Sequence, residues 1–489
     1  MARVVIVGGG IGGLCTALLL GREGHEVTVC ECDPAPVPAS PDEAWSRWPR
    51  PGTPQARLGH SFLAGFRSQM RERLPDVLEL VLGNGAPQSD VAKNMPGEDR
   101  RAEDAELGLV LVRRPVLEAA LRRAVEAEPT VRMLAGRRVR GLLAEPVSRS
   151  GVPRVSGVDT AAGSIQADTV VVAGGRAVPV GRWFGAIGAD APSEQAEGCG
   201  SACYTRYFRI LDRDDEDDYV ASAIGIHREP GYLLYELQGA DNRTFAAEIA
   251  VPITDKPMKR LRDTAVWTAA AMSMPEWPEW IDPERSQPIT PAVDVMGQER
   301  NTLRRFVADG RPLALGVHVI GDARCQTDSL FAWGCGNALM AAAALADAIA
   351  DHPGDDDAQA LALADAVDGE LADRYAYSVA RDRASERLRR GEPRWDTMTA
   401  GIGLIDGVLW PAADHDADVF RAVHRWDLQL DPAGQVESDT TIVERARAAL
   451  GEIREPPVDN EGIPTREQLL DAMASAGAPA SGASGAEHH

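Results

Sequence analysis

The chain has 489 residues, enough for two or three domains with substantial cores. Its 51 Lys and Arg residues stand against 74 Asp and Glu residues, which gives a formal net charge of −23 at pH 7. A surface this acidic repels nucleic acids and anionic lipids, so we expect neither as a partner.

The seven cysteines are scattered along the chain, and several lie in apolar stretches. This pattern favours free thiols in a reducing cytosol over a disulfide framework or a metal site. The N-terminus starts directly in an apolar strand, and no apolar run reaches about 18 residues. We therefore predict a cytoplasmic protein without a membrane segment, and a disordered tail over the Gly/Ala/Ser/Pro-rich residues 476–489.

The first predicted element is the β-branched run Val4 to Val7, typical of a strand buried on both faces. Three glycines with G-x-G-x-x-G spacing follow it and lead into an apolar helix. In such a motif Gly8 permits a tight turn, Gly10 lets a pyrophosphate approach the backbone, and Gly13 lets the helix pack closely on the strand. The anion then lies at the helix N-terminus. The predicted cofactor-binding residues of this turn are Gly8, Gly10, Ile11, Gly12 and Gly13.

A second short strand, Glu26 to Cys30, ends in Glu31, which lies 18 residues after Gly13. At this spacing a carboxylate accepts hydrogen bonds from a ribose. An acidic side chain also argues against a 2′-phosphate, so the predicted ligand is FAD or NAD rather than NADP. Together these features favour a dinucleotide site over a glycine-rich turn without a ligand.

The next stretch carries weaker signals. The Pro-rich residues 34–54 predict irregular structure, and apolar residues at helical spacing predict a helix from Leu58 that Pro75 interrupts. The polar residues 88–106 indicate an excursion into a second domain or a mobile loop. Residues 109–112 predict a short strand.

A helix is predicted from Val116 to Ala127, with Pro115 favourably placed in its first turn. Arginine at a helix start is disfavoured by the helix dipole, so Arg114 indicates a phosphate partner. The alternative is a solvated basic pair with Arg113.

The apolar run Thr169 to Ala173 predicts a further parallel strand of the first sheet. Beyond it, four segments alternate apolar and polar residues, which predicts an antiparallel sheet with one wet face. On these strands Tyr204, Arg206 and Tyr235 face either a substrate or solvent. The four segments are 203–211, 219–227, 231–237 and 244–251.

The first domain resumes in a strand at 312–320 that runs into Gly321 and Asp322. A carboxylate at a strand end accepts hydrogen bonds from sugar-alcohol hydroxyls, although Asp322 alone is equally consistent with a helix-capping turn residue. The helix start at 334–337 offers backbone N–H donors that suit the N1–C2=O edge of a flavin. The predicted flavin-side residues are Asp322, Gly334, Gly336 and Asn337.

Three cofactor signals therefore occur along the chain: the glycine motif with Glu31, then Arg114, and then Gly321–Asp322 after the inserted antiparallel sheet. This arrangement resembles the p-hydroxybenzoate hydroxylase-like FAD-dependent monooxygenases over roughly residues 2–349. Three motifs are similar to a bacterial branch of that family often found in natural-product pathways; they span residues 52–60, 110–118 and 309–313. The resemblance implies an α/β fold: a Rossmann-like FAD-binding domain of the glutathione-reductase type, an inserted antiparallel-sheet substrate domain and a helical C-terminal segment.

By this resemblance Gly8, Gly10, Gly13 and Glu31 hold the ADP half of FAD. Arg114 reaches its pyrophosphate side, Asp322 its ribityl chain, and residues 334–337 the isoalloxazine. The predicted FAD-binding domain comprises 1–75, 106–180 and 312–352, the substrate domain 76–105 and 181–311, and the helical segment 353–475. That last segment either packs across the domain junction or makes a dimer contact.

The resemblance implies hydroxylation or epoxidation through a C4a-hydroperoxyflavin. The expected substrates are molecular oxygen and an aromatic, polyketide or alkaloid-like small molecule of secondary metabolism. His60, which ends the first motif, is the candidate catalytic group near the flavin; the alternative is a plain histidine at a helix start. The sequence leaves the substrate and the oligomeric state open.

Two departures from the family bear on the source of electrons. Val172 stands where the family carries an aspartate before glycine, and residues 327–330 replace the usual proline after Gly-Asp-Ala. The electron source is thus either NAD(P)H or a partner flavin reductase. Alternative functions are a non-redox FAD-scaffolded cyclase or isomerase, an isoprenoid double-bond reductase, and a nucleotide-binding module without catalysis.

The segment Trp277-x-x-Trp280-Ile281 differs in spacing from the W-x-W-x-I-P motif of flavin-dependent halogenases, and a proline separates its tryptophans. We interpret Trp277 and Trp280 as packing residues at a domain junction.

Overall fold

The computed structural model describes residues 1–97, 99–145, 151–211, 227–297, 300–451 and 460–476. The chain divides into two compact units, Met1–Cys199 with Glu299–Pro456 and Gly200–Gln298 with Pro457–His489. Residues 76–105, 181–199 and 300–311, predicted for the substrate domain, therefore lie in the first unit, and residues 460–475 of the predicted helical segment lie in the second. The division into a cofactor domain and a substrate domain stays a prediction.

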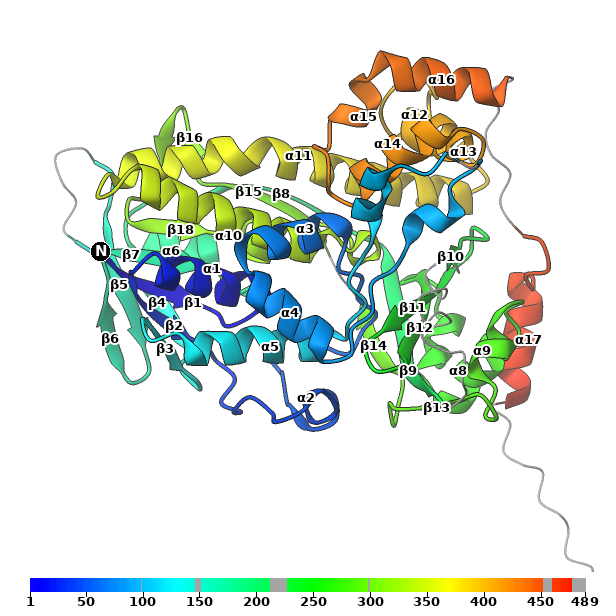
Figure 1. The fold of residues 1–489 in the computed structure, drawn as a ribbon, viewed down its shortest axis with the longest axis horizontal. Helices are drawn as coiled ribbons and strands as arrows, with labels where there is room; N and C mark the ends of the chain where they lie inside the picture. The colour runs from blue at the N-terminus through cyan, green and yellow to red at the C-terminus, as the bar shows by residue number, and fades with distance from the viewer. Residues whose placement is uncertain (98, 146–150, 212–226, 298–299, 452–459, 477–489) are drawn as a thin grey trace, which may run out of the picture. The chain divides into compact units, whose positions relative to one another are not determined.

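The first unit is built on a five-stranded parallel sheet with the strand order β18-β7-β1-β2-β3 (Figure 1). Strand β1 pairs in parallel with β2 on one side and with β7 on the other, and the predicted buried parallel sheet is confirmed. Apolar residues pack against both faces of this sheet, which explains why its central strands are so apolar. The strands are β1 (Arg3–Val7), β2 (Glu26–Cys30), β3 (Val131–Leu134), β7 (Thr169–Val172) and β18 (Val317–Val319).

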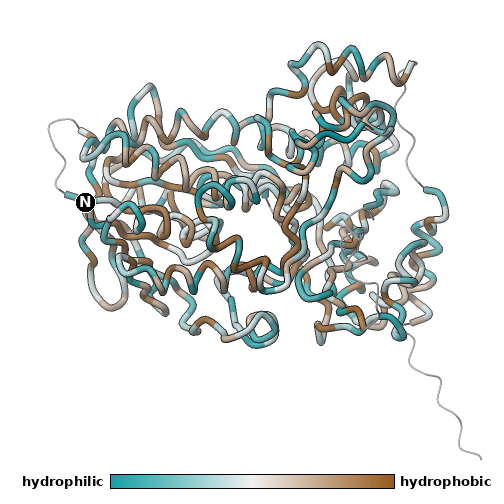
Figure 2. Tube along the Cα trace, in the orientation of Figure 1, coloured by the Kyte–Doolittle hydropathy of each residue, from teal (hydrophilic) through white to brown (hydrophobic). Residues whose placement is uncertain are grey.

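Helices α1 (Ile11–Arg22), α5 (Arg114–Ala127) and α10 (Trp333–Asp351) contribute to the main apolar core beside this sheet. Figure 2 shows the hydrophobic character of β1 and α1. Helix α10 is long and apolar enough to cross a membrane by length and composition, but 67% of its apolar window is buried inside the protein. It therefore has the character of a core helix. Helix α11 (Asp356–Arg389) packs along α10.

Smaller elements complete the first unit. Three antiparallel groupings are β4-β5-β6, β19-β15-β8 and the pair β16-β17. Their bounds are β4 (Val139–Ala144), β5 (Val155–Thr160), β6 (Gly163–Gln166), β8 (Ser193–Gly198), β15 (Arg300–Arg305), β16 (Val307–Ala308), β17 (Arg311–Pro312) and β19 (Cys325–Gln326). The remaining helices and turns are α6 (Val180–Ala186), η5 (Gly321–Ala323), η6 (Ser329–Phe331), α12 (Gly401–Leu404), η7 (Ile405–Leu409), α13 (Trp410–Ala413), α14 (Ala417–Asp427), α15 (Gln435–Ser438) and α16 (Thr440–Leu450).

Between residues 34 and 112 two local predictions were wrong, and a third, the helix that Pro75 interrupts, was correct except for its start. The Pro-rich stretch contains the helix α2 (Pro41–Arg47), because Ser40 Oγ caps it by accepting from Glu43 N at 3.2 Å. The helix expected from Leu58 begins later, as α3 (Ala64–Arg73), and α4 (Pro75–Gly83) follows it. The strand expected at 109–112 is reduced to Val110, which forms only isolated bridges.

The second unit contains the predicted antiparallel sheet, with the order β10-β11-β12-β9-β13 and with β14 also paired to β9. The expected wet face was wrong for the central strands, because nearly every residue of β9 and β12 is buried. Its strands are β9 (Ser201–Ile210), β10 (His227–Arg228), β11 (Leu234–Ala240), β12 (Thr244–Pro252), β13 (Ser286–Pro288) and β14 (Asp294–Gly297). Residues 219–226 of one predicted strand lie outside the described residues. Between β12 and β13 the chain forms η4 (Pro257–Arg262) and α8 (Thr264–Ala271), and the Asp263 carboxylate caps α8 by accepting from Ala265 N and Val266 N.

One face of this sheet packs against α8, α9 (Trp277–Ile281) and α17 (Arg466–Ala476). Tyr204 and Tyr235 are buried in that core, so the expectation that they face substrate or solvent was wrong. Arg206 shares the face, with its guanidinium 5.5 Å from the Trp267 ring. The pattern of alternation gave the correct strands but did not identify which face the helices cover. The tryptophans of α9 are buried in the same core, so their packing role is confirmed, whereas their location at a domain junction stays a prediction.

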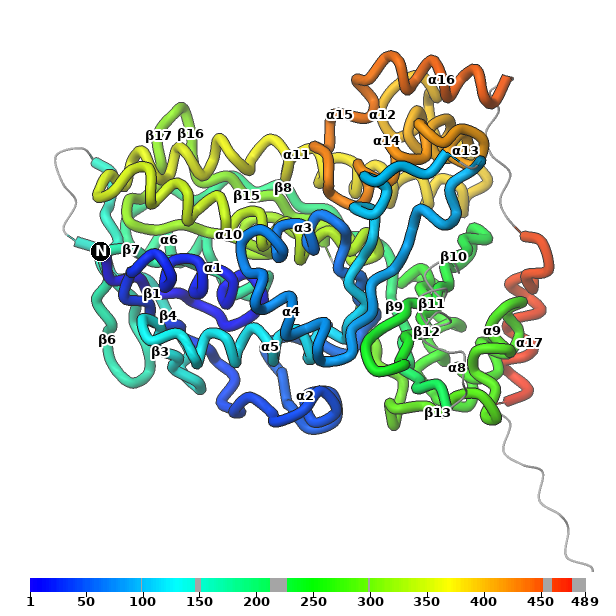
Figure 3. Tube along the Cα trace, in the orientation of Figure 1, coloured from blue at the N-terminus to red at the C-terminus, as the bar shows by residue number. Residues whose placement is uncertain are grey.

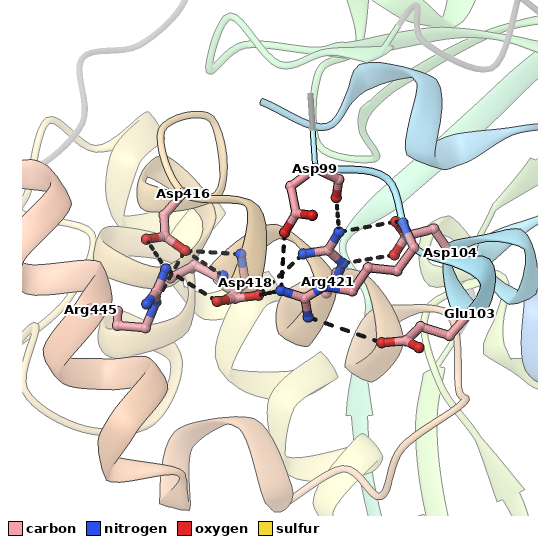
Figure 4. Close-up of polar contacts among 9 residues, drawn as sticks. Asp99, Glu103, Asp104, Asp416, Asp418, Arg421 and Arg445 are labelled. Carbon is pink, nitrogen blue, oxygen red and sulfur yellow. Dashed lines mark hydrogen bonds and ion pairs between the residues drawn. The ribbon is translucent and has the colours of Figure 1, made fainter. Parts of the chain in front are cut away.

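The segment predicted as an excursion or mobile loop lies in the first unit, beside α14 (Figure 3). It contains η1 (Val91–Asn94) and η2 (Ala102–Leu107). Arg421 of α14 donates to Asp104 Oδ1 at 2.7 Å and to Oδ2 at 3.0 Å, and also contacts the Asp99 carbonyl (Figure 4). The Arg421 and Asp104 side chains are 8% and 3% exposed, so this is a buried ion pair. It fixes the segment against the C-terminal helices.

We predict that Arg421→Ala lowers the free energy of unfolding of the first unit by about 3 kcal/mol at pH 7, because it leaves the Asp104 carboxylate buried without its cation. Arg445→Ala, which removes a more exposed pair with Asp416, is the matched control and should cost about 1 kcal/mol or less. Urea unfolding measures both.

The hydrogen bond from Arg421 lowers the pKa of Asp104. Its stabilisation is therefore present above the ordinary carboxyl pKa and is lost as the pH falls through the lowered value. The difference between Arg421→Ala and the unmodified chain should shrink between pH 7 and pH 3. A constant difference over that range would contradict this assignment.

Candidate active site

The turn between β1 and α1 has the geometry that its glycines predict. Gly8 has φ +106°, and a Cβ atom there would lie 2.6 Å from the Ala173 carbonyl oxygen. A Cβ on Gly13 would overlap the Gly8 carbonyl oxygen. By contrast, a Cβ on Gly10 would meet no atom within 4 Å. The fold itself thus requires Gly8 and Gly13, whereas the space in front of Gly10 is open to a ligand.

Glu31, at the end of β2, is bound to this turn. Its Oε2 accepts from Gly9 N at 2.8 Å and its Oε1 accepts from Asp33 N at 2.7 Å. Each carboxylate oxygen can accept a further bond, which is what a ribose hydroxyl needs. The 18-residue spacing after Gly13 therefore brings the predicted carboxylate to the glycine turn.

Arg50 connects the glycine turn to α5, and no motif or periodicity in the sequence predicts this role. Its Nη2 donates to the Gly9 carbonyl at 3.2 Å, and its Nε donates to Glu118 Oε2 at 3.0 Å. Its Nη1 lies 3.3 Å from Asp33 Oδ2 and 3.7 Å from Glu31 Oε2. One buried guanidinium thereby faces three carboxylates. It lies in the Pro-rich stretch where no structure was predicted.

Arg114 lies in the first turn of α5 and donates from Nε to Glu118 Oε1 at 2.8 Å. Burial raises the pKa of Glu118, but the charges of Arg50 and Arg114 outweigh it, so that the pKa lies below its ordinary value. Arg113 is fully buried, so the alternative of a solvated Arg113–Arg114 pair was wrong. An arginine and a glutamate four residues apart on a predicted helix are the sequence signal that could have identified Glu118.

His60 is connected to Arg114. The Arg114 Nη1 lies 3.2 Å from His60 Nε2, and His60 Nδ1 lies 3.0 Å from the Leu58 carbonyl oxygen. Because a guanidinium can only donate, Nε2 accepts and Nδ1 carries the proton. Burial, reinforced by the charge of Arg114, lowers the pKa of His60 to about 3. The imidazole is therefore neutral with both nitrogens engaged, and its catalytic role stays a prediction.

Asp322 lies in η5, immediately after β18, and faces the start of α10. A Cβ on Gly334 would lie 3.9 Å from Asp322 Oδ1. Burial raises the pKa of Asp322, and the charges of Arg114 and Arg176 oppose that shift. The first N–H groups of α10, as in any helix, have no intrahelical acceptor, and no side-chain cap at the N-cap residue supplies one.

Strands β1, β2 and β18 are parallel members of one sheet, so their carboxyl ends lie at one edge. That edge carries Gly8, Glu31 and Asp322, and ligands of open α/β sheets bind outside such edges. The predicted ADP-side and ribityl-side residues are therefore brought together. The open space at Gly10 and the uncapped start of α10 are features that fit an FAD.

Gly336 and Asn337 of α10 have a protein partner that the sequence did not reveal. Gln429 donates to Asn337 Oδ1 at 2.8 Å, and a Cβ on Gly336 would overlap Gln429 Oε1.

Three comparisons with known proteins bear on this site. The family model of an NAD(P)-binding Rossmann-like domain matches residues 6–37, which span the glycine turn and Glu31. No curated protein matches the chain in sequence.

Several solved structures are similar in fold. PqsL of Pseudomonas aeruginosa, described as a probable FAD-dependent monooxygenase, is 21% identical with a TM-score of 0.55, over 81% of this chain and 100% of PqsL. A triple mutant of the flavin-dependent brominase Bmp2 is 16% identical with a TM-score of 0.59, over 92% and 99% of the two chains. The Diels-Alderase PyrE3 is 15% identical with a TM-score of 0.52, over 88% and 80%. The chain thus has the fold of FAD-dependent monooxygenases and flavin-dependent halogenases, and the predicted fold class is confirmed.

We predict that His60→Gln weakens the acid sensitivity of folding. In the unmodified chain the unfolded state takes up a proton at His60 below pH 6.5 that the folded state does not, so stability falls as the pH drops toward 3. The loss of unfolding free energy between pH 7 and pH 5 should be smaller in the variant by up to about 2 kcal/mol.

Urea titrations at the two pH values measure this change. His318 and His424, whose pKa values burial lowers to about 4, are common to both proteins and cancel in the comparison. Equal losses in the two proteins would show that His60 is not held neutral.

Proposed function

We propose that the chain is an FAD-dependent monooxygenase. The observation that carries the proposal is the single sheet edge that bears the Gly8 turn, Glu31 and Asp322, with open space in front of Gly10. The fold, which it shares with PqsL, supports the same conclusion. The proposed substrate is an aromatic, polyketide or alkaloid-like small molecule of secondary metabolism, oxidised by molecular oxygen in the cytoplasm.

Each residue has a role that its surroundings suit. Glu31 would accept from the adenosine ribose, and the N–H groups around Gly10 would bind the pyrophosphate. Arg114 would add positive charge there, and Asp322 would accept from ribityl hydroxyls. The uncapped first turn of α10 would donate to the N1–C2=O edge of the flavin. FAD, when bound and reduced, supplies the activation of oxygen.

Protein groups keep Arg114 in place before any ligand arrives. Glu118 fixes its Nε, while neutral His60 accepts from its Nη1 without repelling the cation. We propose that His60 positions Arg114 in this way. Burial is the main reason why the pKa of His60 is low, and a protonated imidazole would in addition face a guanidinium at hydrogen-bond distance.

A second candidate function is a non-redox role in which FAD shapes a pocket for cyclisation. Two observations favour it: Val172 replaces the family's aspartate, and the Diels-Alderase PyrE3 shares the fold. The same replacement leaves two electron sources for a monooxygenase, NAD(P)H or a partner flavin reductase.

Anaerobic titration of the purified protein with NADH and NADPH distinguishes the two electron sources, because only direct reduction bleaches the flavin absorbance. Oxygen consumption coupled to product formation supports the monooxygenase. Product formed by fully oxidised protein under nitrogen would contradict it and favour the cyclase.

We predict that Gly10→Ala weakens FAD binding about tenfold or more while the protein still folds. The added methyl group meets no protein atom, but it projects into the space proposed for the pyrophosphate. Gly185→Ala, on α6, is the matched control, since its Cβ is equally free of contacts. Isothermal titration with FAD measures affinity, and thermal unfolding of the ligand-free proteins checks the fold. Equal affinities for the two variants would contradict the proposed site.

A further inference from the structure

Gln429 follows α14 and has an unusual backbone conformation. Its φ is +61°, in the left-handed region that side chains other than glycine seldom adopt. Such a conformation persists only where the surrounding structure fixes it. The surroundings of Gln429 therefore indicate what this residue is placed to do.

The backbone at Gln429 packs tightly against the start of α3. A Cβ on Gly65 would overlap the Gln429 carbonyl oxygen. The Gly65 N–H donates to the Leu428 carbonyl at 2.8 Å. Only glycine fits at position 65, because the backbone of residues 428–429 lies directly against the start of α3.

The side chain of Gln429 lies on the first turn of α10, the turn proposed to contact the flavin. Its Nε2 donates to Asn337 Oδ1 at 2.8 Å and to the Trp333 carbonyl at 3.4 Å. Its Oε1 is buried in the space that a Cβ on Gly336 would occupy. Gly336 is therefore required by a protein contact, in addition to any contact with a cofactor.

The turn that carries Gln429 is fixed from behind by a fully buried arginine. Arg374 of α11 donates to the Trp426 carbonyl at 2.8 Å and to the Asp431 carbonyl at 3.2 Å. Its guanidinium lies 4.8 Å from the Trp333 ring, whose Nε1 donates to the Asp427 carbonyl at 2.9 Å. Bonds on both sides of Gln429 hold its carboxamide at one place.

We propose that Gln429 is a positioning residue for the flavin: it fixes the first turn of α10 and the Asn337 side chain in the orientation that binds the isoalloxazine. This inference rests on the proposed function. The sequence left open whether the C-terminal segment packs across the domain junction or makes a dimer contact. The proposed role of Gln429 gives this segment an influence on the cofactor site. Gln429 acts through α10 and not by touching the flavin, because its Oε1 is buried against Gly336.

The test compares Gln429→Glu and Gln429→Ala with Gln435→Glu, an exposed glutamine on α15 of the same segment. FAD affinity is measured for the oxidised and the reduced cofactor, together with the two-electron potential. Gln429→Glu places a negative charge beside the positive end of α10, which disfavours anionic reduced flavin. We expect its affinity for reduced FAD to fall about tenfold relative to oxidised FAD, a potential about 30 mV lower. Gln435→Glu should leave the potential unchanged.

A double-mutant comparison tests the contact itself. Gly336→Ala alone should weaken FAD binding several-fold, because the methyl group displaces the Gln429 carboxamide. Adding Gln429→Ala removes the clash, so the double variant should bind FAD better than Gly336→Ala alone. Ligand-free thermal unfolding should show the same rescue.

The possible results distinguish the positioning role of Gln429 from the proposed FAD-dependent function. Should the unmodified protein bind FAD while the Gln429 variants match it in potential and affinity, and should Gln429→Ala give no rescue of Gly336→Ala, the positioning role is overturned and the proposed function stands. A protein that binds no FAD in any form overturns both.

Discussion

The candidate site depends on one buried carboxylate, Glu118, which lies between the guanidinium groups of Arg50 and Arg114. An unpaired charge at this depth would be costly, so the three side chains stabilise one another's charged forms. Through Arg50 the group reaches the glycine turn and Glu31, and through Arg114 it reaches His60. The ends of separate elements are thereby fixed together before a ligand binds, which is the preorganisation that a cofactor site requires.

The parallel sheet and the glycine turn could be predicted from sequence because their signals are local. The β-branched run of β1 must be buried, and Gly8 and Gly13 are required by contacts within the turn itself. Glu31 was found for the same reason, since one helix and one short strand determine its distance from Gly13. The position of Asp322 followed from the strand before it.

Residues whose roles depend on distant partners could not be predicted. Arg50 lies in a Pro-rich stretch with no periodicity, and its three carboxylate partners come from other elements. Gln429 is separated by more than 90 positions from the helix turn it contacts. Tyr204 and Tyr235 show the related limit for strands: alternation gives two faces, but the helices that cover one of them decide which is buried.

The proposed roles of these residues all require that one FAD binds at the carboxyl edge of the parallel sheet in the first unit. To test this, the purified protein is incubated with excess FAD, freed of unbound cofactor and then denatured. Mass spectrometry quantifies the flavin that is released. We expect one FAD per chain. A protein that retains no flavin, or that retains a nicotinamide dinucleotide in its place, would contradict it.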